Sequence, residues 1–240
     1  MPVITIEGPM GSGAATIGHM VAEKLEINFV DRLVLTEAAK LVRAPVEALI
    51  DKEQKPVRFR DRLNSFIKAM LESSASNANM YSAAGFAAFS PESLAALASA
   101  DTKKAAKVTD ADFIKATTTV VEDLYRAGNV VIIGRGANVI LADTPGVFHV
   151  GLVASLGVRT ETLMAAEHLE REAAEVYVEG LEEARVKYFR KFFQVHPNEP
   201  SLYHTLLNRD KVPPEAAVDI IVQAAEALAS GRHPQRAATR

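Results

Sequence analysis

The feature that most constrains the fold is a β-branched run that stops at a glycine-rich turn close to the N-terminus. Residues 3–6 (VITI) are typical of a short buried strand, and residues 8–13 (GPMGSG) end it abruptly. After the turn, Ile17, Met20 and Val21 recur at helical spacing, which predicts an amphipathic helix. Strand, glycine turn and helix together predict a βα unit at the start of an α/β fold.

Later segments repeat this alternation of apolar strands and helices. The expected elements are a strand at 27–31 followed by a helix, a helix at 109–128, a strand at 130–133, a strand at 147–154, a helical region at 159–194, a strand at 203–208 and a helix at 213–228. Strands that are apolar on both faces and alternate with helices predict a parallel β-sheet flanked by helices. The fold class is therefore α/β, with three layers.

Composition excludes several functional classes. Apolar residues make up 48% and charged residues 24% of the 240, which is typical of a folded globular domain. A net charge of -3 provides no field for a polyanion, so nucleic acid is not an expected partner. The chain has no cysteine, no apolar run long enough for a membrane span and no secretory signal in residues 1–8, so we expect a cytoplasmic protein.

The glycine turn has the residues of a phosphate-binding cradle. Gly8, Gly11, Ser12 and Gly13 would place backbone N–H groups at a helix N-terminus, where an anion is favoured. The spacing from Gly8 to Gly13 matches the glycines of a P-loop, but Ala14 occupies the lysine position. A plain tight turn is the alternative, and a dinucleotide-binding turn is weaker because the third glycine of its motif is missing.

Several segments, in order, resemble the nucleoside monophosphate kinases, and specifically the cytidylate-kinase-like family. They are residues 4–6 with 11–13, 29–32 (FVDR), 131–138 (VIIGRGAN) and 203–208 (YHTLLN). The resemblance covers about two thirds of the chain. It implies a P-loop fold over residues 1–230, with a helical or mobile acceptor-site insert at 43–107, a helical lid at 159–194 and a polar tail at 231–240.

The resemblance also implies a function and a set of site residues. The expected reaction transfers the γ-phosphoryl group of ATP, with Mg²⁺, to a nucleoside monophosphate such as CMP. The implied roles fall on the phosphate cradle (Gly8, Gly11, Ser12, Gly13), the Mg²⁺-side hydroxyl (Thr16), the acceptor site (Asp31, Arg135, Arg159) and a phosphoryl clamp in the lid (Arg185, Arg190), with Asp31 also assigned to catalysis. In true cytidylate kinases an aspartate follows the arginine that Arg135 matches, whereas this chain has Gly136.

Alternatives stay open at several of these positions. Asp31 is equally typical of a helix N-cap, and the basic residues of the lid are equally typical of a solvated helix face. Residues 73–100 hold one charged residue, Glu92, and favour a mobile segment over a contact surface for a partner protein or a second copy. The six histidines show no metal-ligand spacing. The absence of lysine at Ala14 supports a second hypothesis, in which a degenerate kinase fold serves as a nucleotide sensor or as a subunit of a complex.

Overall fold

The computed structural model describes residues 2–32, Leu35 and residues 110–230. The expected insert at 43–107, which includes residues 73–100, and the tail at 231–240 lie outside the described residues, as does most of the helix expected after residues 27–31.

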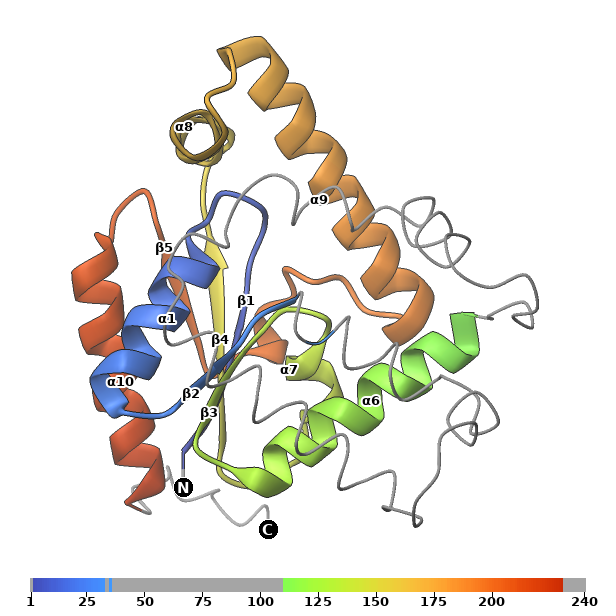
Figure 1. The fold of residues 1–240 in the computed structure, drawn as a ribbon, viewed down its shortest axis with the longest axis vertical. Helices are drawn as coiled ribbons and strands as arrows, with labels where there is room; N and C mark the ends of the chain where they lie inside the picture. Colours follow the sequence, from blue (N-terminus) through green and yellow to red (C-terminus); the bar gives the residue numbers. More distant parts are fainter. Residues whose placement is uncertain (1, 33–34, 36–109, 231–240) are drawn as a thin grey trace, which may run out of the picture.

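A five-stranded parallel sheet forms the centre of the molecule, in the order β2-β3-β1-β4-β5 (Figure 1). The strands are β1 (Val3–Glu7), β2 (Asn28–Val30), β3 (Val130–Ile133), β4 (Val147–Val153) and β5 (Thr205–Asn208). β1 and β3 are buried at every position, as strands covered on both faces must be. The α/β class and the flanked parallel sheet expected from the sequence are confirmed.

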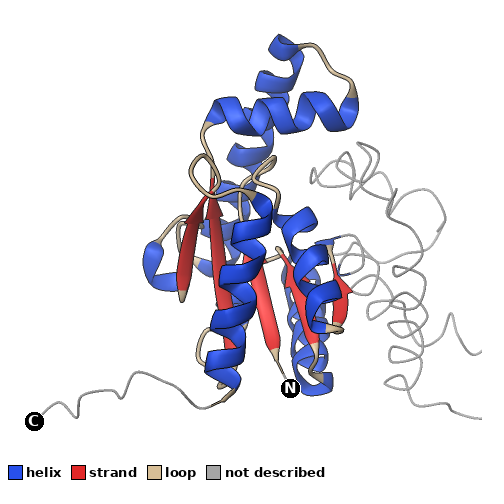
Figure 2. Ribbon diagram, turned by 90° about the vertical axis from the view of Figure 1, so that its left-hand side faces the viewer, coloured by secondary structure: helices blue, strands red, loops and turns tan. Residues whose placement is uncertain are grey.

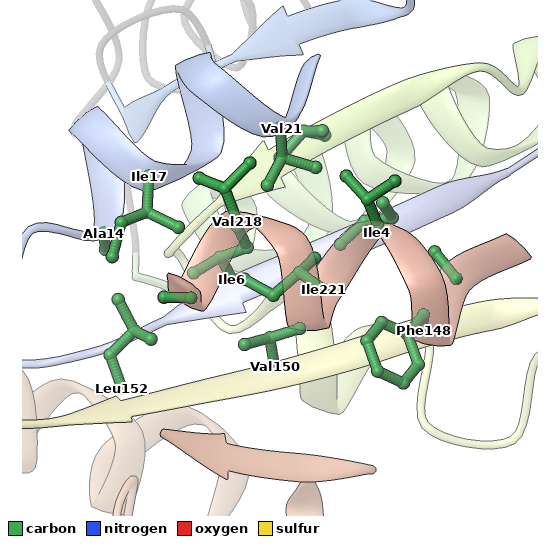
Figure 3. Close-up of a cluster of buried hydrophobic side chains, with 14 of the residues drawn as sticks. Ile4, Ile6, Ala14, Ile17, Val21, Phe148, Val150, Leu152, Val218 and Ile221 are labelled. Carbon is green, nitrogen blue, oxygen red and sulfur yellow. The ribbon is translucent and has the colours of Figure 1, made fainter. Parts of the chain in front are cut away.

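Helices cover both faces of the sheet (Figure 2). On one face, α1 (Ala14–Leu25) and α10 (Pro214–Ala229) pack against the side chains of Ile4, Ile6 and Val150, among others (Figure 3). On the other face, α6 (Asp110–Ala127) and the short α7 (Ala137–Ile140) cover Val3 and Ile132. Alternate residues of one strand thus belong to two different cores, which is why these strands contain almost no polar residues.

The connections after β1 and β3 leave the sheet in opposite directions. The chain passes from β1 to α1 on one face and from β3 to α7 on the other, although the two strands are neighbours. In parallel α/β sheets, ligands bind beyond the carboxyl ends of the strands at such a switch point. The glycine turn at 8–13 and the Gly134-Arg135-Gly136 turn both lie at this edge.

Two helices stand beyond the carboxyl edge of the sheet, at the top of Figure 1. They are α8 (Leu156–Glu167) and α9 (Arg171–Phe193), so the single helical region expected at 159–194 is divided by a break at His168, whose φ is 54°. Met10 of the glycine turn packs with Leu163, Ala174 and Val178 of these helices in a separate small core. The helices that follow β4 are therefore attached directly to the glycine turn.

The remaining differences from expectation are local. The strand expected at 203–208 begins only at Thr205, because a 3-10 turn, η2 (Pro200–Leu202), precedes it. The four-residue α7 was not expected from the sequence. Among the described residues, no helix is long and apolar enough to span a membrane.

Candidate active site

The turn after β1 has the backbone geometry of a phosphate cradle. Gly11 and Gly13 both adopt left-handed conformations, with φ of 81° and 82°, which L side chains rarely adopt. The Gly13 carbonyl accepts the N–H of Ile17 at 2.9 Å, so Gly13 is the N-cap of α1. The side chain of Ser12 is buried inside the turn, and its Oγ has no hydrogen-bond partner in the described part of the chain. The turn therefore presents the N-terminus of α1 and a buried hydroxyl with spare hydrogen-bonding capacity.

The first turn of α1 carries no charge. Ala14 is buried in the core between α1 and β4, where Figure 3 shows it beside Ile17 and above Leu152. Thr16, the expected Mg²⁺-side residue, lies exposed two positions further along the helix. No side chain in the first turn of α1 can neutralise the negative charge of a phosphate group.

The described residues contain no group of three or more carboxylates and imidazoles that could hold a metal ion. Mg²⁺ commonly binds through nucleotide phosphates and water with one or two protein oxygens, and the exposed Thr16 hydroxyl fits that mode. When bound, Mg²⁺ would neutralise charge on the phosphates.

Arg135 lies in a second left-handed turn, between Gly134 and Gly136, at the carboxyl end of β3. Its guanidinium carbon is 5.9 Å from the ring centroid of Phe113 and 5.8 Å from that of Tyr188. Burial lowers the pKa of Arg135 to about 10 and raises that of Tyr188 to about 12. The Tyr188 hydroxyl donates to the Arg135 carbonyl at 3.3 Å. Arg135 is therefore a fixed cation between aromatic rings of α6 and α9.

Asp31 and Arg32 follow β2 at the same edge. The Asp31 carbonyl accepts the N–H of Leu35 at 3.1 Å, so Asp31 begins a helical turn. Its roles as acceptor contact and N-cap stay predictions. The Arg32 Nη2 donates to the Gly8 carbonyl at 3.3 Å. Burial lowers the pKa of Arg32 against the opposing effect of the Glu7 carboxylate. The end of β2 thus contacts the glycine turn directly.

Arg185 is already bound to protein groups. Its Nε and Nη2 donate to the two carboxylate oxygens of Glu182, each at 2.9 Å, and its Nη1 donates to Glu7 Oε1 at 3.4 Å. Nη2 also contacts the side chain of Asn198. Burial lowers the pKa of Arg185, but the bonds to Glu182 and the charge of Glu7 outweigh it, so that the pKa is raised. In this conformation the Arg185 guanidinium joins α9 to the end of β1 through Glu7 and does not face an open space.

The two other arginines expected from the sequence occupy different surroundings. Arg190 is exposed near the end of α9. The backbone of Arg159, in the first turn of α8, lies so close to Gly11 that a Cβ there would be 2.4 Å from the Arg159 carbonyl oxygen. Arg159, which the resemblance assigned to the acceptor site, therefore lies beside the cradle. Arg190, which the resemblance assigned to the lid, lies on the surface.

Sequence reasoning missed two residues of the site. Glu7, at the end of β1, is almost completely buried. A charged residue at the end of an apolar strand and next to a glycine turn could have been recognised in the sequence as a candidate site residue. Arg209 follows β5, and its Nε is 3.7 Å from the position that a Cβ on Gly13 would occupy. No local pattern marked Arg209, because only the strand order brings the end of β5 near α1.

A parallel sheet of this order, with a phosphate cradle after β1 and two helices over it after β4, defines a kinase-type P-loop α/β protein. The chain belongs to the cytidylate kinase-like family, whose sequence model matches residues 3–211. The expected family and fold are both confirmed.

Solved structures that are similar to the chain share little sequence with it. An uncharacterized protein from Eubacterium ventriosum ATCC 27560 matches with a TM-score of 0.62 at 15% identity, over 95% of this chain and 99% of that chain. Shikimate kinase from Bacteroides thetaiotaomicron has a TM-score of 0.44 at 16% identity, over 95% and 98%. A gluconokinase from Sinorhizobium meliloti 1021 has a TM-score of 0.45 at 15% identity, over 97% and 98%. No curated protein matched the sequence significantly.

Proposed function

We propose that the chain binds ATP with Mg²⁺ at the turn of residues 8–13 and transfers its γ-phosphoryl group to a nucleoside monophosphate such as CMP. The observation that carries the proposal is the pair of left-handed turns at the switch point, one after β1 and one after β3. The first supplies Gly11, Ser12 and Gly13 for the donor phosphates. The second holds Arg135 at the neighbouring strand end, one strand from the cradle.

The roles of the other residues follow from their places at this edge. Asp31 and Arg135 would contact the acceptor from the ends of β2 and β3. Arg32, at the end of β2, donates a hydrogen bond to the Gly8 carbonyl and so holds the proposed acceptor side against the glycine turn. The pair of Arg185 and Glu7 holds α9 against the end of β1. Thr16 would face Mg²⁺ on the nucleotide, and the exposed Arg190 would have to move with α9 to reach a phosphate. Phosphoryl transfer depends on positioning and charge compensation, so no nucleophilic side chain is needed.

The proposal is tested by incubating the protein with ATP, Mg²⁺ and CMP and separating the nucleotides. We expect ADP and CDP in equal amounts, and UMP and AMP in parallel reactions define the acceptor base. ADP formed at the same rate with and without every monophosphate would show hydrolysis and contradict the transfer.

A second candidate function is nucleotide sensing without turnover. Two observations favour it: the uncharged first turn of α1, and the neutralisation of Arg185 by Glu182 and Glu7. In that case ATP would bind without yielding ADP. The variant Ala14→Lys, if it melts like the wild type, would then strengthen ATP binding or create turnover, whereas no change in either would show that the turn is not a phosphate site.

A further inference from the structure

Because Ala14 replaces the P-loop lysine, the first turn of α1 offers no positive charge to a bound triphosphate. The first residues of this helix are Ala14, Ala15, Thr16 and Ile17, and the methyl group of Ala14 is buried in the core. A kinase of this type needs a cation on the outer phosphates, because charge shifts there during transfer. The cation must therefore come from another element that reaches the cradle.

Arg159, in α8, lies beside the cradle. Its backbone contacts Gly11, and Met10 holds α8 and α9 against the same turn through Leu163 and Ala174. The Nε and Nη1 atoms of Arg159 are fully buried, and neither has a hydrogen-bond partner among the residues that the structure describes. Buried guanidinium nitrogens without partners are costly, so an anion bound beside them would be stabilised.

Arg209 reaches the other end of the cradle from β5. Its backbone N–H donates to the Val153 carbonyl at 2.8 Å, which fixes the residue at the carboxyl edge of the sheet. Its Nη1 donates to the Val212 carbonyl, while the buried Nε, next to Gly13, has no partner within the described part of the chain. Arg209 therefore stands beside the N-terminus of α1.

These two arginines differ from Arg185 in their ion pairs. Arg185 is bound by two carboxylates, whereas no carboxylate of the described residues pairs with Arg159 or Arg209. The buried, unpartnered hydroxyl of Ser12 lies in the turn between Gly11 and Gly13, the glycines that the two arginines approach. Two arginines and one hydroxyl at the cradle thus have hydrogen-bonding capacity that the described residues leave unused.

We propose that Arg159 and Arg209 replace the P-loop lysine and bind the phosphate chain of the nucleoside triphosphate from the two ends of the cradle. The proposal rests on the proposed function, because it assigns the donor phosphates to this turn. It differs from the expectation that Arg159 contacts the acceptor, and it adds Arg209, a residue outside the lid.

The test measures binding of inorganic tripolyphosphate and of ATP by calorimetry, without an acceptor. The variants are Arg159→Gln, Arg209→Gln and the double variant. Each single variant should weaken tripolyphosphate binding at least about tenfold, since a charge-assisted hydrogen bond is lost. The matched control is Arg126→Gln, which removes an exposed arginine whose ion pairs, with Glu122 and Asp123, lie within α6. The control should bind both ligands like the wild type.

A second measurement uses the wild-type protein and does not depend on whether the variants fold. In NMR spectra, the Nε–H signals of Arg159 and Arg209 should shift when tripolyphosphate is added, and the Nε–H signal of Arg126 should not.

The outcomes separate the two proposals. Tripolyphosphate and ATP binding that survives in the double variant, or Nε–H signals of the two arginines that do not shift with tripolyphosphate, would overturn the arginine assignment and leave the kinase function standing. Tripolyphosphate binding that needs both arginines, without ATP binding, would support the assignment and contradict the kinase function. No binding of either ligand by the wild type would overturn both.

Discussion

At the residue scale, the buried pair of Glu7 and Arg185 connects the end of β1 to the middle of α9. The exposed fraction is 3% for the Glu7 side chain and 9% for that of Arg185, so water screens this interaction little. Removing one member of a buried pair leaves a charge without compensation, which is more destabilising than losing an exposed pair.

We expect Glu7→Gln to lower the free energy of unfolding by about 3 kcal/mol, at the lower end for a broken buried pair because Arg185 keeps Glu182. The control is Asp219→Asn, which breaks the exposed pair with Lys24 and should cost less than about 1 kcal/mol. Urea unfolding of both variants gives the comparison. Equal losses would show that the Glu7 pair contributes no more than a surface contact.

His149 predicts how stability depends on pH. It is buried in β4, its Nδ1 is 2.7 Å from Thr5 Oγ1, and its ring stacks on that of His204 at 5.1 Å between centroids. Burial, with a smaller effect of His204, lowers the pKa of His149 to about 4. Between pH 6.5 and 4 the unfolded chain therefore binds a proton that the folded chain does not, and stability must fall as the pH is lowered through this window.

The expected loss from His149 is about 3 kcal/mol, from a pKa difference of about 2.5 units. The variant His149→Gln should flatten the pH profile of the free energy of unfolding between pH 6.5 and 4. The matched control is His196→Gln, at an exposed histidine. A slope that persists in His149→Gln would assign the acid sensitivity to other groups.

At the scale of elements, the turn after β3 explains why this chain has glycine where true cytidylate kinases have aspartate. Gly136 has a φ of 72°, and a Cβ there would lie 2.2 Å from the ring of Phe193, the last residue of α9. The end of α9 therefore packs where a side chain at position 136 would be. Glycine at position 136 therefore fits the close packing of Phe193 against this turn.

Gly136→Ala tests this packing, and Gly146→Ala is the matched control. Gly146 also has a left-handed backbone, with φ 77°, but a Cβ there meets nothing within 4 Å. The control should lose about 1 kcal/mol from backbone strain alone, and Gly136→Ala should lose about 1–3 kcal/mol more because Phe193 must move. Thermal melting of both variants decides the point, and equal melting temperatures would contradict the packing account.

At the scale of the whole molecule, the sequence predicted what local patterns determine. The β-branched runs at 3–6 and 130–133, the glycine turn and the helical periodicities were enough for the parallel α/β fold and for the βα turn at 8–13. What it could not predict depends on contacts between distant segments. The pairing of Glu7 with Arg185 and the approach of Arg209 to Gly13 exist only because the strand order brings these segments to one edge.

The most direct test of the account is a calorimetric titration of the wild-type protein with ATP and Mg²⁺, with and without CMP. We expect ATP to bind below millimolar concentration and ATP and CMP to occupy the protein together, because the proposed donor and acceptor sites lie at different strand ends of one edge. No heat of binding for either nucleotide at millimolar concentrations would contradict the central claim that this edge of the sheet is a nucleotide site.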